Sequence, residues 1–283
     1  MTRMTLQNNT ITIKRTLKNT LLVAALSSTL SVSAVAEAEA KDILIPTLTL
    51  AAGFLNHPNF TYSDDYHVDD DIWITSSDGV TLAANVLTPT SGNGPFPAII
   101  FVNSWTMNEY EYTIEAQKLA ADGYVVLSYS TRGFGSSEGL IDTAGPNDIS
   151  DYSHIIDWLI EHTPTDPERI GSAGISYGSG ISLIGAAQDN RIKAVAAMSS
   201  WGSLKDSLYG NNTPPLVWGQ LLDYSSMITG RPDPVIHEYY NAMLDQEVER
   251  TDELIEWATP RSPLTYVKQL NENGTAIYLA KNW

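Results

Sequence analysis

The sequence predicts an α/β fold in which a mostly parallel sheet carries helices on both faces. Two short apolar runs, AIIFV at residues 98–102 and YVVLSYS at residues 124–130, are typical of strands that are buried on both faces. Such runs alternate along the chain with segments of helical periodicity, which favours parallel strands joined by crossover helices. The chain has 283 residues, 43% of them hydrophobic, which suffices for one large α/β domain or two small ones with a substantial core.

The elements of this sheet are expected in a regular order. A β-hairpin is predicted over residues 72–89, where two alternating runs flank Ser77-Asp78-Gly79. Further strands are expected at residues 98–102, 124–130, 169–175 and 192–198. Helices are expected at residues 109–122, with Ile114, Leu119 and Ala120 at helical spacing, at residues 148–162, with Ile149, Tyr152, Ile155, Ile156 and Leu159 on one face, and at residues 181–187.

Residues 202–268 interrupt this alternation. They are rich in aromatic and turn residues, and helical patches are predicted between residues 235 and 258. We therefore expect this segment to form a cap inserted over the sheet. TAIYLA, residues 275–280, returns to a strand pattern shortly before the chain ends at Trp283. A single α/β domain is thus predicted over residues 67–283.

The first 36 residues have the features of a secretory signal peptide. Lys14, Arg15 and Lys18 form a basic region, the apolar run of residues 21–36 follows, and Ala34-Val35-Ala36 offers a cleavage site. The run is short and contains several Ser and Thr, which argues against a spanning helix of about 20 apolar residues. The sequence therefore predicts export to the periplasm or the exterior, a mature N-terminal arm over residues 37–66, and no integral membrane span in the mature chain.

The charge and the cysteine content exclude several classes of function. The formal net charge is −17; removing the four basic side chains of residues 1–36 leaves 12 basic against 33 acidic ones, or −21. Such a surface repels nucleic acids and anionic lipids. The absence of cysteine excludes disulfides, thiolate catalysis and Cys-based zinc sites. DDYHVDDD, residues 64–71, leaves two possibilities, a hard-cation site or a solvated acidic loop, of which we favour the loop. No cofactor or metal is predicted.

The motif G-x-S-x-G occurs as GISYGSG at residues 174–180. It lies between the predicted strand at 169–175 and the predicted helix at 181–187, which is the setting in which this motif presents a nucleophilic serine. Ser176 is therefore the candidate nucleophile. The backbone amide of Tyr177, at the start of a helix, is the candidate donor to a developing oxyanion.

A second motif identifies a family resemblance. RGFGSSEG at residues 132–139 follows the strand at 124–130 and fits the pattern R-G-x-G-x-S-x-G. With GISYGSG it resembles the Xaa-Pro dipeptidyl-peptidase and cocaine-esterase family of α/β-hydrolases over residues 68–283. The run at 197–214 is also similar to the segment that enters this family's helical cap. The resemblance implies an α/β-hydrolase fold and a serine hydrolase that cleaves ester or Xaa-Pro peptide bonds.

The sequence departs from the family pattern at two places. Ser130 stands where the family often has aspartate, two residues before the motif arginine, Arg132, which we interpret as a structural residue. Trp105 takes the place of a tyrosine whose phenol helps the family's oxyanion hole. It belongs either to the oxyanion region, through its indole N–H, or to the pocket wall. A backbone amide near Ser104 or Trp105 is the favoured second oxyanion donor.

The general base and its acid are harder to place. In α/β-hydrolases the order along the chain is serine, acid, histidine. The histidines are His57, His67, His154, His162 and His237. Four of them precede Ser176, and His237 lies in the expected cap, so we expect the acid and the histidine beyond Trp283 and the fragment itself to be inactive. An atypical base at His237 stays open. Ordinary structural roles are expected for Asp148, Asp151, Asp166 and Asp206.

Two functional hypotheses follow. The first is an exported serine hydrolase that acts on a small-molecule or peptide substrate through Ser176 and an acyl-enzyme. The alternative is a non-catalytic hydrolase fold that binds ligands through its aromatic cap. The reading frame past codon 283 discriminates between them: an aspartate and a histidine there favour the enzyme, and a stop codon favours the binding protein or a non-functional fragment.

Overall fold

The structure of the protein is a computed structural model, and it describes residues 58–281. The predicted signal peptide at residues 1–36 and most of the predicted arm at residues 37–66 lie outside the described residues. The described residues belong to one compact unit, which runs from Leu55 to Trp283.

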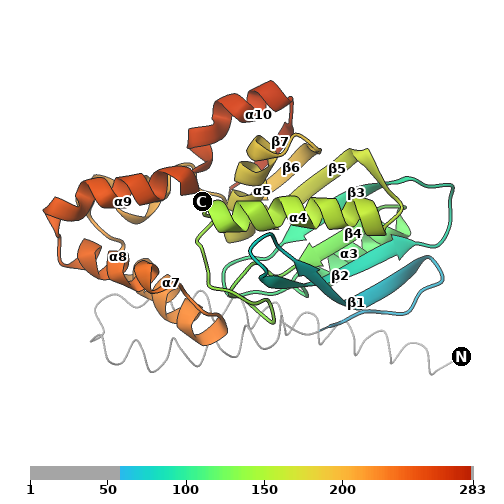
Figure 1. The fold of residues 1–283 in the computed structure, drawn as a ribbon, viewed down its shortest axis with the longest axis horizontal. Coiled ribbons are helices and arrows are strands. Elements are labelled where there is room, and N and C mark those ends of the chain that lie inside the picture. Colours follow the sequence, from blue (N-terminus) through green and yellow to red (C-terminus); the bar gives the residue numbers. More distant parts are fainter. Residues whose placement is uncertain (1–57, 282–283) are drawn as a thin grey trace, which may run out of the picture. The chain divides into compact units, whose positions relative to one another are not determined.

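A seven-stranded sheet forms the centre of this unit (Figure 1). Its strand order is β1-β2-β4-β3-β5-β6-β7; β2 is antiparallel to β1 and to β4, and the neighbours from β4 to β7 are parallel. This confirms the predicted α/β fold with a mostly parallel sheet. The strands are β1 (Tyr66–Thr75), β2 (Thr81–Pro89), β3 (Phe96–Val102), β4 (Val125–Tyr129), β5 (Thr165–Ile175), β6 (Ile192–Met198) and β7 (Ala276–Ala280).

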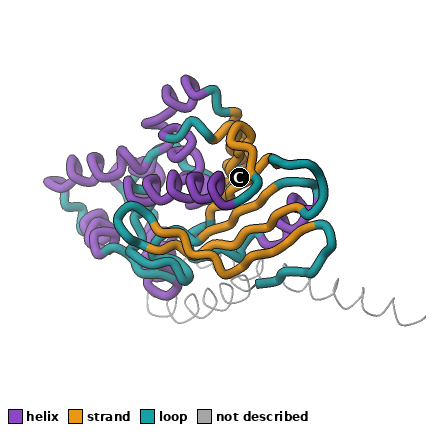
Figure 2. Tube along the Cα trace, turned by 45° about the vertical axis from the view of Figure 1, so that its right-hand side comes forward, coloured by secondary structure: helices purple, strands orange, loops and turns teal. Residues whose placement is uncertain are grey.

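Helices, drawn in purple in Figure 2, cover both faces of the sheet. Side chains alternate between the two faces of β3: Ile100 and Val102 belong to the larger core, and Phe101 belongs to the smaller one. The larger core is covered by α4 (Pro146–His162) and α5 (Tyr177–Gln188), and the smaller one by α3 (Thr113–Ala121). The continuous apolar runs of the sequence therefore mark strands with cores on both sides.

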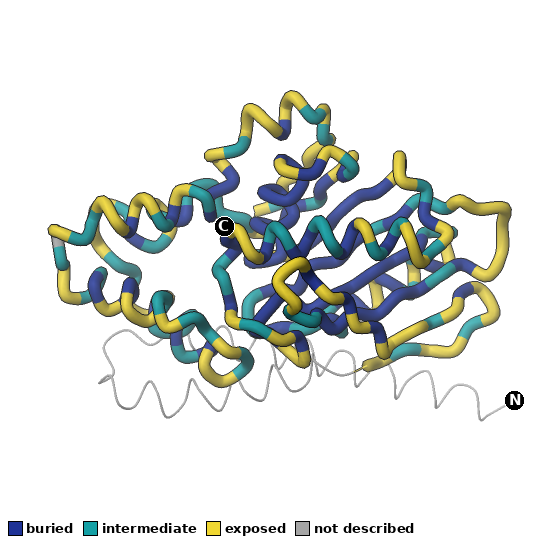
Figure 3. Tube along the Cα trace, viewed as in Figure 1, coloured by how far each residue is buried: buried dark blue, intermediate teal, exposed yellow. Residues whose placement is uncertain are grey.

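The segment between β6 and β7 is helical, as expected for the cap. It contains α6 (Leu204–Leu208), α7 (Leu216–Thr229), α8 (Pro234–Leu244), α9 (Thr251–Ala258) and α10 (Val267–Asn273), with short 3₁₀ turns between them. Figure 3 shows that buried residues concentrate in the sheet and that these helices carry many exposed ones. None of the described helices is long and apolar enough to cross a membrane.

Two arginines fasten the cap to the loop after β4. The Arg231 amide donates to the Gly133 carbonyl at 2.8 Å, and the Ile141 amide donates to the Arg231 carbonyl at 2.9 Å. Arg261, beyond α9, donates through its guanidinium to the Asp142 carboxylate at 2.8 Å. Both anchors of the segment from 231 to 261 therefore lie on the same loop.

Two sequence expectations about helices need correction. The helix predicted from residue 109 begins at Thr113, because the residues before it form turns in which the side chains of Glu109 and Glu111 accept hydrogen bonds from Ser130 and Ser104. Ile114 is exposed, and the buried positions of α3 are Thr113, Ala116 and Ala120. Helices α7 and α10 lie outside the predicted helical patches at residues 235–258.

Candidate active site

Ser176 sits at a sharp turn between β5 and α5, at the carboxyl end of the central parallel strands. Its backbone has φ 51° and ψ −112°, a conformation that a residue with a side chain adopts only under strain of about 1–3 kcal/mol. The Ser176 amide donates to the Met198 carbonyl at 2.8 Å, which ties the turn to β6. The strand before the motif and the helix after it are thus both present.

Glycine is required at position 178 of this motif because of a close approach. A Cβ atom there would lie 2.1 Å from the carbonyl oxygen of Val102, at the end of β3. At Gly174 a Cβ would lie 2.5 Å from the Gly178 carbonyl carbon. The G-x-S-x-G pattern therefore lets the first turn of α5 pack directly on the ends of β3 and β5.

A cavity of about 360 Å³ opens over Ser176, between the strand ends and the cap. The described residues that line it include seven with aromatic side chains and one carboxylate, Asp223 of α7. Its lining includes Trp105, Ser176, Tyr177, Ser199, Ser200, Trp201, Trp218, Asp223, Tyr239, Tyr240, Trp257 and Lys281. Such a concave, mostly apolar space with few polar groups is typical of a site for a small molecule or a peptide side chain.

Trp105 forms part of this wall, and its indole N–H is already engaged. It donates to the Leu222 carbonyl of α7 at 3.0 Å. The ring packs edge-on against Phe134 and Tyr177, each with ring centroids 5.1 Å apart. The indole therefore contacts the cap in this arrangement, and any contribution of Trp105 to an oxyanion site falls to its backbone amide.

Three backbone amides near Ser176, those of Ser104, Trp105 and Tyr177, differ in whether they already donate a hydrogen bond. The Ser104 amide donates to the Glu111 carboxyl at 2.6 Å, so it is occupied. Within residues 58–281, the amides of Trp105 and Tyr177 donate no hydrogen bond to the backbone. Tyr177 begins α5, where the unpaired amides of the first turn and the helix dipole favour negative charge. These two amides are the donors that the geometry leaves for an oxyanion.

The side chain of Tyr177 serves a different purpose from its amide. It is buried, and its hydroxyl donates to Asp148 of α4 at 2.6 Å. The Ala144 amide donates to the same carboxyl oxygen at 2.9 Å. Burial, with Asp142 and Asp151 nearby, raises the pKa of Asp148 to about 8. Asp148, for which we expected an ordinary structural role, thus holds the residue that follows Ser176.

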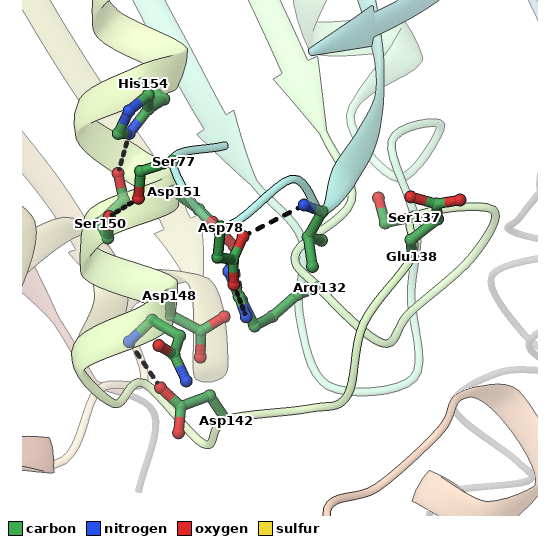
Figure 4. Close-up of polar contacts among 12 residues, drawn as sticks. Ser77, Asp78, Arg132, Ser137, Glu138, Asp142, Asp148, Ser150, Asp151 and His154 are labelled. Carbon is green, nitrogen blue, oxygen red and sulfur yellow. Dashed lines mark hydrogen bonds and ion pairs between the residues drawn. The ribbon is translucent and has the colours of Figure 1, made fainter. Parts of the chain in front are cut away.

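The side chain of Arg132 points toward Asp78 and Asp151 (Figure 4). This arrangement agrees with the structural role expected from the sequence. Its guanidinium donates twice to the Asp151 carboxylate of α4, at 2.8 and 2.7 Å, and once to Asp78 of the β1–β2 turn at 3.0 Å. Burial opposes the charge of Arg132, but these hydrogen bonds outweigh it and raise its pKa. The arginine binds carboxylates of two elements and makes no contact with Ser176 that would suggest catalysis.

None of the described histidines is hydrogen-bonded to Ser176. His67 lies in β1, and His154 and His162 bind carbonyls of their own helix. His237 of α8 binds Asp223, with 2.9 Å between Nδ1 and Oδ2. No histidine among residues 58–281 hydrogen-bonds the hydroxyl of Ser176. The sequence had suggested His237 as an atypical base but not its partner Asp223, which is the charged residue of α7.

The acidic cluster of residues 64–71 lies in and before β1, with most of its side chains exposed. Within the described residues, no group of three or more His, Cys, Asp or Glu side chains is placed to hold a metal ion.

Comparison with known proteins identifies the family. The family model for X-Pro dipeptidyl-peptidase (S15 family) matches residues 78–275. The chain belongs to this family. That range contains the turn with Ser176, the loop with Arg132 and the cap. Dipeptidyl aminopeptidase BIII of Pseudoxanthomonas mexicana is 25% identical over 214 residues, which are 70% of this chain and 28% of that protein.

Further similarities agree with this assignment. The protein PA2218 of Pseudomonas aeruginosa is 30% identical over 138 residues, which are 47% of this chain and 37% of that protein. The chain therefore spans less than half of the length of these relatives. Acetyl xylan esterase from Paenibacillus sp. R4 has a similar fold, with a TM-score of 0.58 at 14% identity over 80% of this chain and 81% of the esterase. The similarity in fold agrees with the α/β-hydrolase fold that the sequence predicts.

Proposed function

We propose that the protein is an exported serine hydrolase in which Ser176 attacks the carbonyl carbon of an ester or of an Xaa-Pro peptide bond. The Ser176 hydroxyl proton passes to a general base as the Oγ–C bond forms, and the carbonyl oxygen becomes an oxyanion. The amides of Tyr177 and Trp105 stabilise that oxyanion. The leaving alcohol or amine takes the proton as the scissile bond breaks, and water then hydrolyses the acyl-enzyme.

The position of Ser176 carries this proposal. It is the residue at the strained turn between β5 and α5, and it lies in the wall of the aromatic cavity. A binding module gains nothing from a strained turn that presents a hydroxyl beside unpaired amides. Strain of this kind clusters at sites where a reacting group must be held in one orientation.

We propose that the acid and the base of this mechanism follow β7 along the chain, as the serine–acid–histidine order of the fold implies. Two observations support this assignment. No histidine of the described residues hydrogen-bonds Ser176, and the fold's chain order expects the acid after the strand that β7 forms. Chain 1–283 alone is then expected to hydrolyse little or nothing.

The substrate enters from the cap side in this proposal. Trp201, Trp218 and Trp257 give the cavity an apolar wall that suits an acyl group or a proline ring. The dipeptidyl aminopeptidase BIII relationship supports a peptide substrate, and the acetyl xylan esterase fold supports an ester. Of these two substrate classes we favour the Xaa-Pro peptide, because the family match covers the cap as well as the sheet.

The test uses the chain extended to the natural end of its reading frame. Turnover of Xaa-Pro p-nitroanilides and of p-nitrophenyl acetate is measured for the parent and for Ser176→Ala. Loss of a nucleophile leaves only the contribution of binding and the oxyanion site, so a fall of about 10³-fold or more in kcat is expected. Ser200→Ala, which changes another serine of the same cavity, is the matched control and is expected to keep activity. Equal activity of the parent and Ser176→Ala would contradict the proposal.

The pair of His237 and Asp223 supports a second candidate, in which the cap supplies the base. The contact between Nδ1 and the carboxylate matches the way an acid orients a catalytic histidine. His237→Ala in the extended chain separates the two proposals. Retained kcat supports a base beyond Trp283, and a loss as large as that of Ser176→Ala supports the cap histidine. No activity in any variant, with ligand binding intact, would support the non-catalytic binding protein.

A further inference from the structure

The carboxyl group of Glu111 lies beside the turn that carries Ser176, and the mechanism above does not use it. Glu111 belongs to the segment between β3 and α3. The Ser104 amide donates to its Oε2 at 2.6 Å, and the Ser104 hydroxyl lies 2.6 Å from its Oε1. Glu111 therefore makes two short contacts with the first residues after β3.

The same contacts reach the peptide that leads into Ser176. The Ser104 hydroxyl lies 3.1 Å from the Ile175 carbonyl oxygen. The Ile175 amide donates to the Tyr112 hydroxyl at 3.0 Å. Both backbone polar groups of Ile175 are thus held by residues that adjoin or bind Glu111, while β6 holds the Ser176 amide from the other side.

The number of protons decides which form of Glu111 fits this arrangement. The Ser104 hydroxyl has one proton, but it lies within hydrogen-bond distance of both the Glu111 carboxyl and the Ile175 carbonyl. If Glu111 is ionised, both neighbours are acceptors and one of the two contacts lacks a proton. If Glu111 is protonated, it donates to Ser104, and Ser104 donates to Ile175, so every contact is satisfied.

We propose that Glu111 is a positioning residue for Ser176, whose carboxyl proton completes a hydrogen-bond chain through Ser104 to Ile175 and so fixes the peptide before the nucleophile. Loss of that proton turns the Ser104 hydroxyl toward Glu111 and releases the Ile175 carbonyl. The inference rests on the proposed role of Ser176, and it adds a dependence on pH that the serine mechanism alone does not contain.

The surroundings of Glu111 place this change near neutral pH. Burial raises the pKa of Glu111 to about 7, against the hydrogen bonds from Ser104 and Tyr112, and the charge of Glu115 on α3 acts in the same direction as burial. No ion pair joins Glu111 to a cation among the described residues. The proton therefore leaves as the pH rises through about 7.

Glu111→Gln tests the proposal because an amide imitates the protonated acid at every pH. Its NH₂ donates to Ser104 Oγ and its carbonyl accepts from the Ser104 amide. Hydrogen exchange of peptides that cover residues 170–180 is measured between about pH 6 and 8 and corrected for the intrinsic rate. In the parent, protection is expected to fall about two- to tenfold across this range, the worth of one hydrogen bond. In Glu111→Gln it stays constant.

Glu115→Gln is the matched control, because it removes a nearby negative charge without touching Ser104. It is expected to keep the transition of the parent, shifted to lower pH. A parent without a transition at residues 170–180, or a Glu111→Gln variant with the parent's transition, would overturn the inference.

The extended chain gives a second readout that separates this inference from the proposed function. The parent is expected to lose kcat above about pH 7, with KM unchanged, and Glu111→Gln is expected to lack that decline. A transition in hydrogen exchange without Ser176-dependent turnover would refute the role of Ser176 as nucleophile, but it would still support the hydrogen-bond chain from Glu111 through Ser104 to Ile175. Turnover without either transition would refute the positioning role.

Discussion

Arg132 is a buried cation, and its two acidic partners determine what its removal costs. Its side chain is 6% exposed, and that of Asp151 is 1% exposed. Such a pair contributes little net stability compared with apolar residues of the same shape, but breaking it leaves a buried charge without compensation. The arginine of the RGFGSSEG motif therefore matters through the acids that it neutralises.

Arg132→Met is expected to lower the free energy of unfolding by about 3–5 kcal/mol, because Asp151 then stays buried without a cation. Urea denaturation followed by tryptophan fluorescence measures the change. Arg169→Met is the matched control, since the ion pair of Arg169 with Asp166 is exposed and no measurable loss is expected. Equal losses of unfolding free energy in both variants would show that the buried ion pair contributes no more to stability than the exposed one.

At the scale of elements, α5 owes its position to residues without side chains. Gly178 allows contact with the end of β3, and a Cβ at Gly180 would meet the ring of Trp201 at 2.1 Å. Helix propensity alone favours alanine over glycine by about 1 kcal/mol inside a helix. The close packing at these glycines opposes that preference. Whether replacing one of them by alanine raises or lowers the stability of the fold therefore depends on how closely the helix lies against its neighbours.

Gly178→Ala is expected to destabilise the fold by about 1–3 kcal/mol despite the better propensity of alanine, since its Cβ meets a backbone oxygen that has little room to move. Thermal unfolding measures the difference. Gly210→Ala serves as the control, because no atom lies within 4 Å of a Cβ built there. A Gly178→Ala variant as stable as the parent would contradict the close approach.

The elements differ in how well the sequence predicts them. The strand at residues 192–198 is found with its predicted bounds, because a mostly apolar run between turn signals identifies it, although Lys193 and Ala194 are exposed. Helix α7 was not predicted, since Leu216, Val217 and Trp218 are apolar yet exposed and obscure the helical period. Helix α10 carries a usable signal that was overlooked, the left-handed Gly274 just past its end.

The residues of the candidate site also differ in how well the sequence predicts them. Ser176 and Tyr177 are marked by a local motif, so the sequence suffices to propose them. The contacts of Glu111 with Ser104, and of Asp223 with His237, join residues whose partners depend on the meeting of separate elements. The engagement of the Trp105 indole by α7 is also a matter of tertiary packing. No periodicity or spacing in the sequence reports such contacts.

At the scale of the whole molecule, β7 is the sheet's least protected strand within the described residues. It pairs with β6 on one side, and Tyr278 and Leu279 are 66% and 67% exposed. An apolar strand with a free row of backbone donors and acceptors is a template for pairing with another chain. The unit from residue 58 to 283 is therefore expected to self-associate as its concentration rises.

Tyr278→Lys is expected to reduce this association, because a charge on an edge strand opposes pairing between sheets. Sedimentation velocity over a range of concentrations measures the effect. Leu264→Lys changes an equally exposed apolar residue outside the sheet and is expected to leave association as it was. The same reduction in both variants would assign the association to general surface hydrophobicity.

The two anchors at Arg231 and Arg261 have a consequence for how this family can diversify. Both hold the cap to one loop, the loop that follows β4, so the chain between them leaves and returns at neighbouring points of the scaffold. Helices α8 and α9 lie between these points and contribute Tyr239, Tyr240 and Trp257 to the cavity. We therefore expect that the sequence and length of this stretch can change, and with them the specificity, while the nucleophile and its supports keep their places.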